Sequence, residues 1–157
     1  MSAASAVRFS VLVLGLVAAS GCGGSSATAS TSSALPPGYY IVITNMAYSP
    51  LDLAVPAGST ITVVNRDVAM PHSVTQQVAP GTFTPGSPSG TPFDTGLFTG
   101  TRSFVVPAGL AAGTVLHYYC ASHGATMATP NGTITIDPLA QVSPGVDPGP
   151  PGGGYGY

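Results

Sequence analysis

Charged side chains are almost missing from this sequence. Among 157 residues only three are lysine or arginine and five are aspartate or glutamate, and in fact all eight are arginine or aspartate. So little positive charge cannot form the basic groove that attracts phosphate groups, and we therefore expect no nucleic-acid binding. The helix formers glutamate and lysine do not occur, whereas valine, threonine, glycine and proline are plentiful. This composition favours strands and turns over helices.

Cysteine is also scarce, since Cys22 and Cys120 are the only two residues of this type. An even number of cysteines in an exported chain ordinarily suggests a disulfide. Here each cysteine stands in a sequence context that predicts a separate role for it. We therefore do not expect the two to be bonded to each other.

The first 21 residues have the pattern of a signal peptide. Arg8 supplies a short positive region, and the apolar run 9–19 is too short to span a bilayer comfortably. The following Ala19-Ser-Gly-Cys22 resembles the lipobox of bacterial lipoproteins, although that family prefers leucine where Ala19 stands. The resemblance implies an acylated Cys22 and an exported protein, held at the periplasmic or cell-surface side of a membrane. The alternative is a plain secretory signal with an incidental cysteine.

Two segments of biased composition flank the expected domain. Residues 22–37 begin with the lipidated cysteine and consist mostly of serine, alanine, threonine and glycine, which predicts a flexible tether. Residues 140–157 are rich in proline and glycine, and we expect them to be disordered. The folded part is therefore predicted at residues 38–139, which is long enough for one modest core.

Short runs of alternating apolar and polar residues recur along this domain. In residues 59–65, for example, Ile61 and Val63 fall on one side, and Thr60 and Thr62 fall on the other. The expected strands cover residues 39–44, 51–55, 59–65, 72–77, 102–106, 114–119 and 133–137. Residues 78–92 are rich in proline and glycine and are expected to be a loop. Short strands at this spacing predict a β-sandwich, and we find neither an internal repeat nor a helix pattern.

Four residues that could bind a metal ion stand in two short segments. His72 lies in the first segment, and Cys120, His123 and Met127 lie together in the second. One thiolate, two imidazoles and a weak thioether form a trigonal donor set that favours copper over zinc. Cys120 ends a predicted strand, so the turn after it can bring His123 and Met127 to one point. Cys120 would be deprotonated when a metal ion is bound.

The same segments resemble the cupredoxin family, especially its plastocyanin, pseudoazurin and amicyanin group. The resemblance rests on Val-Pro-Ala-Gly-Ser-Thr-Ile-Thr-Val-Val-Asn at 55–65, on Pro71-His72, on Phe-Asp-Thr-Gly at 93–96, and on Cys120-x-x-His123. The Cys-x-x-His motif alone is a weak indication of this family. Its combination with an upstream histidine, a following methionine and an all-β pattern is specific. The resemblance implies a single-domain, all-β Greek-key sandwich. It also implies one type 1 copper ion held by His72, Cys120, His123 and Met127.

Two features depart from the family pattern. Relatives usually place two or four residues between the loop histidine and the methionine, whereas three residues separate His123 from Met127. This spacing makes Met127 the ligand that most needs a test. Relatives also often have asparagine after the first histidine, where it ties the two ligand loops together. Ser73 stands there in this chain, and its hydroxyl can form a hydrogen bond over a shorter reach.

The remaining candidate residues are expected to be structural. His117 lies on the strand face opposite to Cys120, and Met46 and Met70 are interpreted as core and surface filling. A thiol nucleophile at Cys120 with His123 as its base is a further alternative. Against it, both residues lie on one short loop and the sequence indicates no carboxylate or amide that would orient the base.

The functional hypothesis is an electron carrier that is not an enzyme. Copper would alternate between Cu(I) and Cu(II), and redox partner proteins would dock transiently on an uncharged patch of Met70, Pro71, Gly124 and Ala125 beside His123. The protein is expected to be a monomer. The alternative is a copper storage or delivery lipoprotein, for which an exposed, methionine-rich site would be typical. A copper enzyme with further metal centres is not expected, because only His117 is left over.

Overall fold

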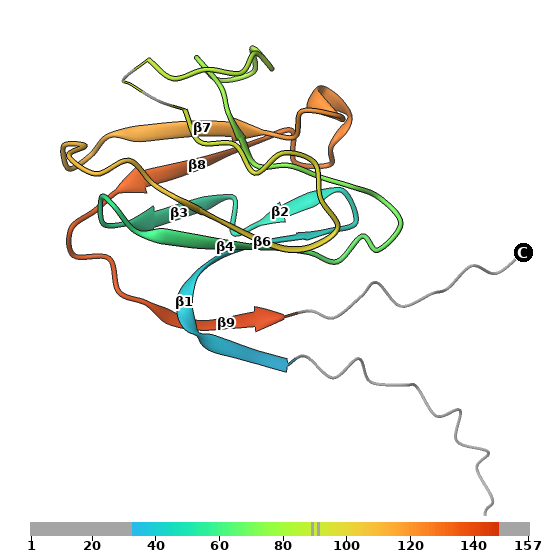
Figure 1. The fold of residues 1–157 in the computed structure, drawn as a ribbon, viewed down its shortest axis with the longest axis horizontal. Helices are drawn as coiled ribbons and strands as arrows, with labels where there is room; N and C mark the ends of the chain where they lie inside the picture. The colour runs from blue at the N-terminus through green and yellow to red at the C-terminus, as the bar shows by residue number, and fades with distance from the viewer. Residues whose placement is uncertain (1–32, 89, 91, 148–157) are drawn as a thin grey trace, which may run out of the picture.

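The chain folds into two β-sheets that pack against each other as a sandwich (Figure 1). The computed structural model describes residues 33–88, 90 and 92–147. Within them the only helical element is η1 (Gly124–Thr126), a single turn of 3-10 helix. The predicted all-β sandwich with one domain is thereby confirmed.

The two sheets are both mixed. The first contains β1 (Ser33–Thr44), β2 (Ala47–Ser49), β4 (Thr60–Asn65) and β6 (Gly100–Val105) in the order β2-β1-β4-β6, and β9 (Ser143–Asp147) also pairs with β1. The second contains β3 (Asp52–Val55), β8 (Asn131–Ile136), β7 (Val115–Tyr119) and β5 (Thr75–Gln76) in the order β3-β8-β7-β5. The pairs β1–β4 and β3–β8 are parallel, and the other pairs are antiparallel.

Side-chain alternation along the strands builds the core between the sheets. Ile61 and Val63 of β4 are fully buried, as the alternating pattern predicted, and Ile134 of β8 is buried in the opposing sheet. Each such aliphatic side chain contributes on the order of 2 kcal/mol by leaving water. Aromatic rings complete the core, and Phe93 stacks on Phe104 with 4.5 Å between the ring centroids. The core thus fixes the strands that lead into the candidate site.

A close approach between β7 and β8 positions the strand that ends at Tyr119, directly before Cys120. Tyr118 is fully buried and lies opposite Gly132 in the register of the two strands. A Cβ atom at Gly132 would collide with the ring of Tyr118, so only glycine leaves room for it. The Tyr118 ring also meets Tyr48 edge to face, with 5.0 Å between centroids. This packing fixes the last residues of β7, which directly precede Cys120.

The paired strands extend beyond both predicted domain boundaries. Residues 33–38 continue β1, and they pair in antiparallel fashion with residues 143–147 of β9, with an irregularity between Ala34 and Pro37 (Figure 1). Strands therefore occur at 33–37 and 143–147, within the segments that were expected to be a tether and a disordered tail. Proline is tolerated in such a pair because it lies at a sheet edge. The pair is also fastened to the sandwich, since the hydroxyl of Tyr39 donates to the carbonyl of Ala140 at 2.8 Å.

Several expectations lie outside the described residues. They concern the signal peptide, the lipidated Cys22, the tether up to residue 32 and the tail from residue 148. Among the described residues, no helix is long and apolar enough to cross a membrane.

The segment around the first histidine differs from the prediction. A strand was expected over 72–77, but only Thr75 and Gln76 form β5 and pair with β7. His72 instead makes an isolated bridge with Phe98, in which the backbone bonds run in both directions at 3.1 and 2.9 Å. His72 is thus held by the segment before β6 rather than by the sheet that carries Cys120.

Candidate metal centre

Three of the four predicted ligands meet at one end of the sandwich. The ligand atoms of His72, Cys120 and His123 all lie within 4.8 Å of one another. Cys120 Sγ is 3.7 Å from Nδ1 of His72 and 3.3 Å from Nδ1 of His123. The two imidazole rings face each other at a tilt, with 4.7 Å between their centroids. His72 and Cys120 are fully buried, whereas His123 is partly exposed.

The spacing of these atoms fits a single metal ion. Bonds from a first-row metal to histidine nitrogen and cysteine sulfur are roughly 2.0 to 2.3 Å long, so a trigonal arrangement separates the donor atoms by roughly 3.5 to 3.8 Å. The observed separations of 3.7 and 3.3 Å require little movement to reach that arrangement. One sulfur and two nitrogen donors in a desolvated pocket form a set that suits copper.

A tight turn after β7 brings His123 back to Cys120. The carbonyl of Cys120 accepts the backbone N–H of Gly124 at 2.8 Å and that of His123 at 3.3 Å. His123 then precedes η1, in which the N–H of Thr126 donates to the carbonyl of His123 at 2.9 Å. The Cys-x-x-His spacing therefore works locally, because one turn of chain places both side chains on the same side.

The loop that carries His72 is fixed by Asn65. The amide nitrogen of Asn65 donates to the carbonyls of Met70 and Phe98, each at 2.9 Å. Asn65 is itself buried at the end of β4. This side chain therefore joins β4 to Met70, two residues before His72, and to Phe98, whose backbone pairs with that of His72.

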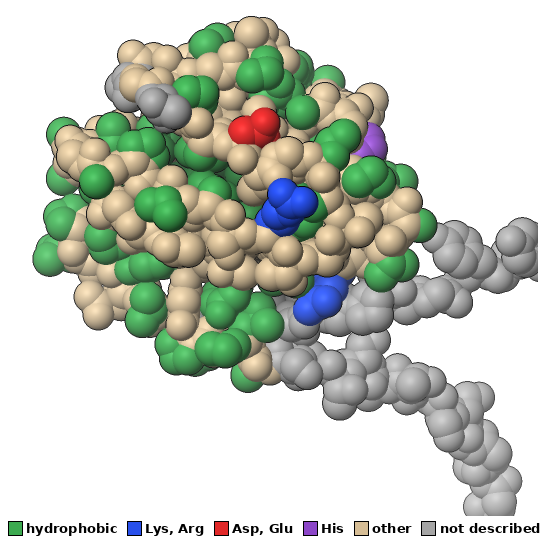
Figure 2. Space-filling model, viewed as in Figure 1, with side chains coloured by type: hydrophobic (Ala, Val, Ile, Leu, Met, Phe, Trp, Pro, Cys, Tyr) green, Lys and Arg blue, Asp and Glu red, His purple; other side chains and the backbone are tan. Residues whose placement is uncertain are grey.

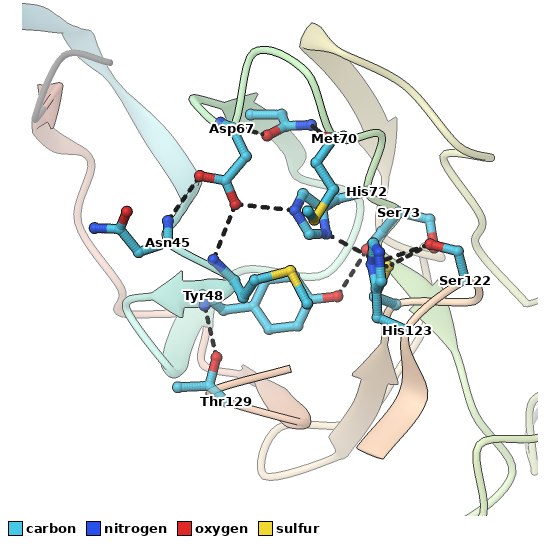
Figure 3. A network of polar contacts seen from close by, with 12 residues as sticks. Asn45, Tyr48, Asp67, Met70, His72, Ser73, Ser122, His123 and Thr129 are labelled. Atoms are coloured by element: carbon cyan, nitrogen blue, oxygen red, sulfur yellow. Dashed lines mark hydrogen bonds and ion pairs between the residues drawn. The ribbon is translucent and has the colours of Figure 1, made fainter. Parts of the chain in front are cut away.

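The imidazole ring of His72 contacts the carboxylate of Asp67. Nε2 of His72 lies 3.0 Å from Oδ2 of Asp67 (Figure 3). An ionised carboxylate only accepts hydrogen bonds, so Nε2 carries the proton of the neutral ring and Nδ1 presents its lone pair toward Cys120. Burial lowers the pKa of His72 below its usual value, although Asp67 partly opposes this effect. The neutral ring that a metal ion requires is therefore the favoured form.

The pKa of Asp67 is itself lowered from its usual value. Burial is the largest single influence and raises this pKa, but the backbone N–H groups of Met46 and Asn45 together with His72 outweigh it. Sequence reasoning did not assign Asp67 to the site. Its position five residues before His72 offers no local pattern that would have revealed the contact.

Ser73 ties the two ligand loops together. Its hydroxyl oxygen accepts the backbone N–H of Ala121 at 2.8 Å, and it lies 2.8 Å from the hydroxyl of Thr75. Thr75 donates its proton to Asp94 at 2.8 Å, so the Ser73 proton is directed to Thr75 and a lone pair remains for Ala121. The shorter serine side chain therefore still bridges the loops, and Thr75 and Asp94 orient it.

A second hydroxyl lies between the candidate ligands. The oxygen of Ser122 is 3.4 Å from Cys120 Sγ and 3.0 Å from Nδ1 of His123. Sequence reasoning did not single out this residue. Its hydroxyl contacts the same atoms that a metal ion would use, so metal binding would displace it from at least one of them.

Met127 is a buried residue of the hydrophobic core. Its side chain is 3% exposed and belongs to the same core cluster as Cys120 and Tyr118. Met127 is the C-cap residue of η1, and the N–H of the next residue, Ala128, donates to the carbonyl of Met46 at 2.8 Å. The backbone of this loop is thus anchored to the β1–β2 turn. The role of Met127 as a fourth ligand stays a prediction.

His117, the remaining histidine, lies outside the cluster. His117 lies within β7, where its carbonyl accepts the N–H of Gln77 at 2.9 Å, and it does not belong to the metal-binding group found among the described residues. Met70 is 39% exposed, as expected for surface filling, and Met46 packs against the core.

The surface near the cluster is uncharged at the predicted docking residues. Pro71 and Ala125 are exposed, Gly124 is partly exposed, and the apolar Val68 and Leu97 are also exposed. Charged side chains are few over the molecule as a whole, and the face in Figure 2 is mostly apolar or neutral. His123, rather than the enclosed His72, therefore offers the more accessible imidazole.

Comparisons with known proteins give matches among solved structures but none with family models or curated proteins. The chain is similar to a purple cupredoxin from Nitrosopumilus maritimus, with 23% identity over 63% of this chain and 99% of that chain and a TM-score of 0.46. It is similar to the oxidized state of a proline-to-alanine variant of amicyanin, with 22% identity over 64% and 83% of the two chains and a TM-score of 0.47. A reduced Cu(I) form of a proline-to-glycine variant of amicyanin has 18% identity over 70% and 95%, with a TM-score of 0.46. These figures describe a likeness of fold only.

Proposed function

We propose that this protein is a cupredoxin-type electron carrier that binds one type 1 copper ion through His72, Cys120 and His123. The observation that carries the proposal is a buried thiol with two imidazole nitrogens at 3.3 and 3.7 Å from its sulfur. Bound copper supplies a one-electron couple between Cu(I) and Cu(II). Met127 is proposed as a weak axial ligand, which its burial in the same core cluster supports.

The residues around the site support fast electron transfer because they hold the ligands in place. The backbone of His72 forms hydrogen bonds with the backbone of Phe98, and its ring contacts the carboxylate of Asp67. Cys120 is held by the turn after β7, and Ser73 joins the two loops. Ligands that are already in position need little rearrangement when the charge of the site changes. The enclosure of His72 and Cys120 also excludes water from the sulfur.

Electrons are proposed to leave and enter at His123. This imidazole is the partly exposed one, and uncharged residues such as Pro71 and Ala125 lie on the exposed surface of the ligand loops. A small apolar patch would give a weak and short-lived encounter with donor and acceptor proteins. No residue of the chain is assigned the role of acid, base or nucleophile.

The proposed place of action is the extracytoplasmic side of a bacterial membrane. The support is the lipobox-like Ala-Ser-Gly-Cys22 after an apolar run. Lipid on Cys22 would hold the domain at the membrane, with the residues between Cys22 and Ser33 as the connection. The protein is proposed to act there as a monomer.

Copper storage or delivery remains the rival function. A delivery site has to release its metal ion to a partner, so its ligands should be open to exchange. Both His72 and Cys120 are fully buried. This burial favours a permanently bound ion and therefore electron transfer.

The visible spectrum of the copper-loaded protein tests the proposal. We expect one copper ion per chain and an intense blue or green colour from thiolate-to-Cu(II) charge transfer. Copper that binds without this colour and exchanges readily would favour storage or delivery. A protein that binds no copper would contradict both functions.

A further inference from the structure

The two-residue turn between β1 and β2 has an unusual backbone. Asn45 and Met46 both adopt the left-handed conformation, with φ of 53° and 61°. Two consecutive residues of this kind form the tight turn that suits a β-hairpin, but methionine is unfavourable there. Such a conformation persists where the surrounding structure holds it.

A carboxylate holds this turn. The backbone N–H of Asn45 donates to Oδ1 of Asp67 at 2.7 Å, and that of Met46 donates to Oδ2 at 2.9 Å. The same Oδ2 lies 3.0 Å from Nε2 of His72. In Figure 3, Asp67 lies between the turn and the imidazole, with a bond to each. Its side chain is only 10% exposed, so these three donors largely replace water around it.

The turn also reaches the second ligand loop. The carbonyl of Met46 accepts the N–H of Ala128 at 2.8 Å, directly after Met127. Further along the same two segments, the N–H of Tyr48 donates to the hydroxyl of Thr129 at 2.6 Å. The turn therefore contacts the His72 loop through Asp67 and the Met127 loop through its own backbone. It carries no ligand of the proposed set.

We infer that Asp67, held by the Asn45–Met46 turn, is a positioning residue that fixes His72 with Nδ1 facing Cys120. The inference deepens the proposed copper site and rests on it for its redox consequences. The carboxylate keeps the proton on Nε2, stops rotation of the ring, and places a negative charge next to the ligand. A partner of this kind orients a histidine ligand and raises its basicity.

A simpler role for Asp67 would be to stabilise the turn alone. That role predicts a change in folding stability without any change in the histidine tautomer or the redox behaviour. A positioning role predicts that the histidine tautomer and the redox behaviour change as well. Two substitutions separate these effects, because Asp67→Ala removes every acceptor, whereas Asp67→Asn keeps one oxygen for His72 and loses the charge.

The first measurement uses the metal-free protein and ¹⁵N NMR of the histidine rings. We expect the native protein and Asp67→Asn to hold the proton of His72 on Nε2, and Asp67→Ala to show a mixture of the two tautomers. Asp137→Asn is the matched control, since Asp137 accepts a backbone N–H from Leu139 and belongs to no contact of the cluster. This readout needs no copper, so it stands even if the proposed function fails.

The second measurement uses the copper-loaded variants. Loss of such a partner typically weakens metal binding about 10- to 100-fold. We expect Asp67→Asn to weaken the binding of Cu(II) more than that of Cu(I). The negative charge that it removes stabilises the more positive ion more strongly. A tenfold loss for Cu(II) alone corresponds to a rise of about 59 mV in the one-electron potential. If Asp67→Ala does not fold, Asp67→Asn still provides this readout.

The outcomes separate the inference from the proposed function. An unchanged tautomer in a folded Asp67→Ala, or a potential in Asp67→Asn that equals that of Asp137→Asn, would overturn the positioning role. A shifted tautomer in a protein that binds no copper would leave Asp67 as an orienting residue and would reject the electron-carrier proposal instead.

Discussion

The hydroxyl oxygen of Ser73 accepts the backbone N–H of Ala121 at 2.8 Å, and this bond joins the loop of His72 to the loop of Cys120. Replacing Ser73 by alanine would leave a partly buried N–H without its acceptor. We expect Ser73→Ala to lower the free energy of unfolding of the metal-free protein by about 1 to 3 kcal/mol. Denaturant unfolding measures the change.

The matched control is Ser103→Ala. Ser103 lies on β6, and its hydroxyl pairs with that of Thr62 in an exposed position. We expect an effect within about 0.5 kcal/mol for this surface substitution. If Ser73→Ala were no more destabilising than Ser103→Ala, the bridge between the loops would contribute nothing measurable to the fold.

Replacing Cys120 by serine should abolish the intense visible colour of the copper protein. An alcohol oxygen cannot provide the soft, covalent bond between thiolate and copper that gives rise to the charge-transfer band. Absorption spectroscopy at equal copper loading provides the measurement. Ser122→Ala should retain the colour, since that hydroxyl only neighbours the sulfur. A Cys120→Ser protein that kept the intense band would show that the proposed ligand set is wrong.

Met127→Leu should keep the copper ion and raise the reduction potential. Leucine fills a similar buried volume, so the fold should change little, whereas loss of a thioether donor destabilises Cu(II) more than Cu(I). Voltammetry of the variant measures the shift, with Met70→Leu as a control at a partly exposed methionine. An unchanged potential and spectrum would place Met127 outside the coordination of the metal ion.

A charge on the proposed docking patch should slow electron exchange. Ala125 is exposed next to Gly124, so Ala125→Asp adds a charge without filling the core. We expect slower transfer to the physiological partner and an unchanged copper spectrum. Salt should change the native rate only slightly, because few charged side chains are present to be screened. A tenfold fall in rate across ordinary salt concentrations would contradict docking on an uncharged patch.

Mass spectrometry of the mature protein should find an acylated N-terminal Cys22. The lipobox-like pattern predicts both cleavage before this residue and its modification. Cys22→Ala should then release the protein from the membrane fraction. A mature terminus at another residue, or a Cys22→Ala protein that stays with the membrane, would argue against the lipid anchor.

Much of the sandwich could be predicted from local sequence patterns. The alternation in residues 60–65 reports which side chains face the core, because successive side chains of a strand point to opposite faces. The short β2 was missed, since three residues are too few to show a period. The pairing of β9 with β1 was missed because Pro144 and Gly145 look like part of a disordered tail, and only the opposite strand supplies their partners.

The sequence by itself determined the donor chemistry and the local Cys120–His123 geometry, because three residues of turn are enough to bring these side chains together. Only the tertiary structure decided which distant groups complete the surroundings. Asp67 meets a turn 22 residues away, and Ser73 meets a loop 48 residues away. Such contacts depend on the order and packing of the strands rather than on any local pattern. The enclosure of His72 and the exposure of His123 have the same origin.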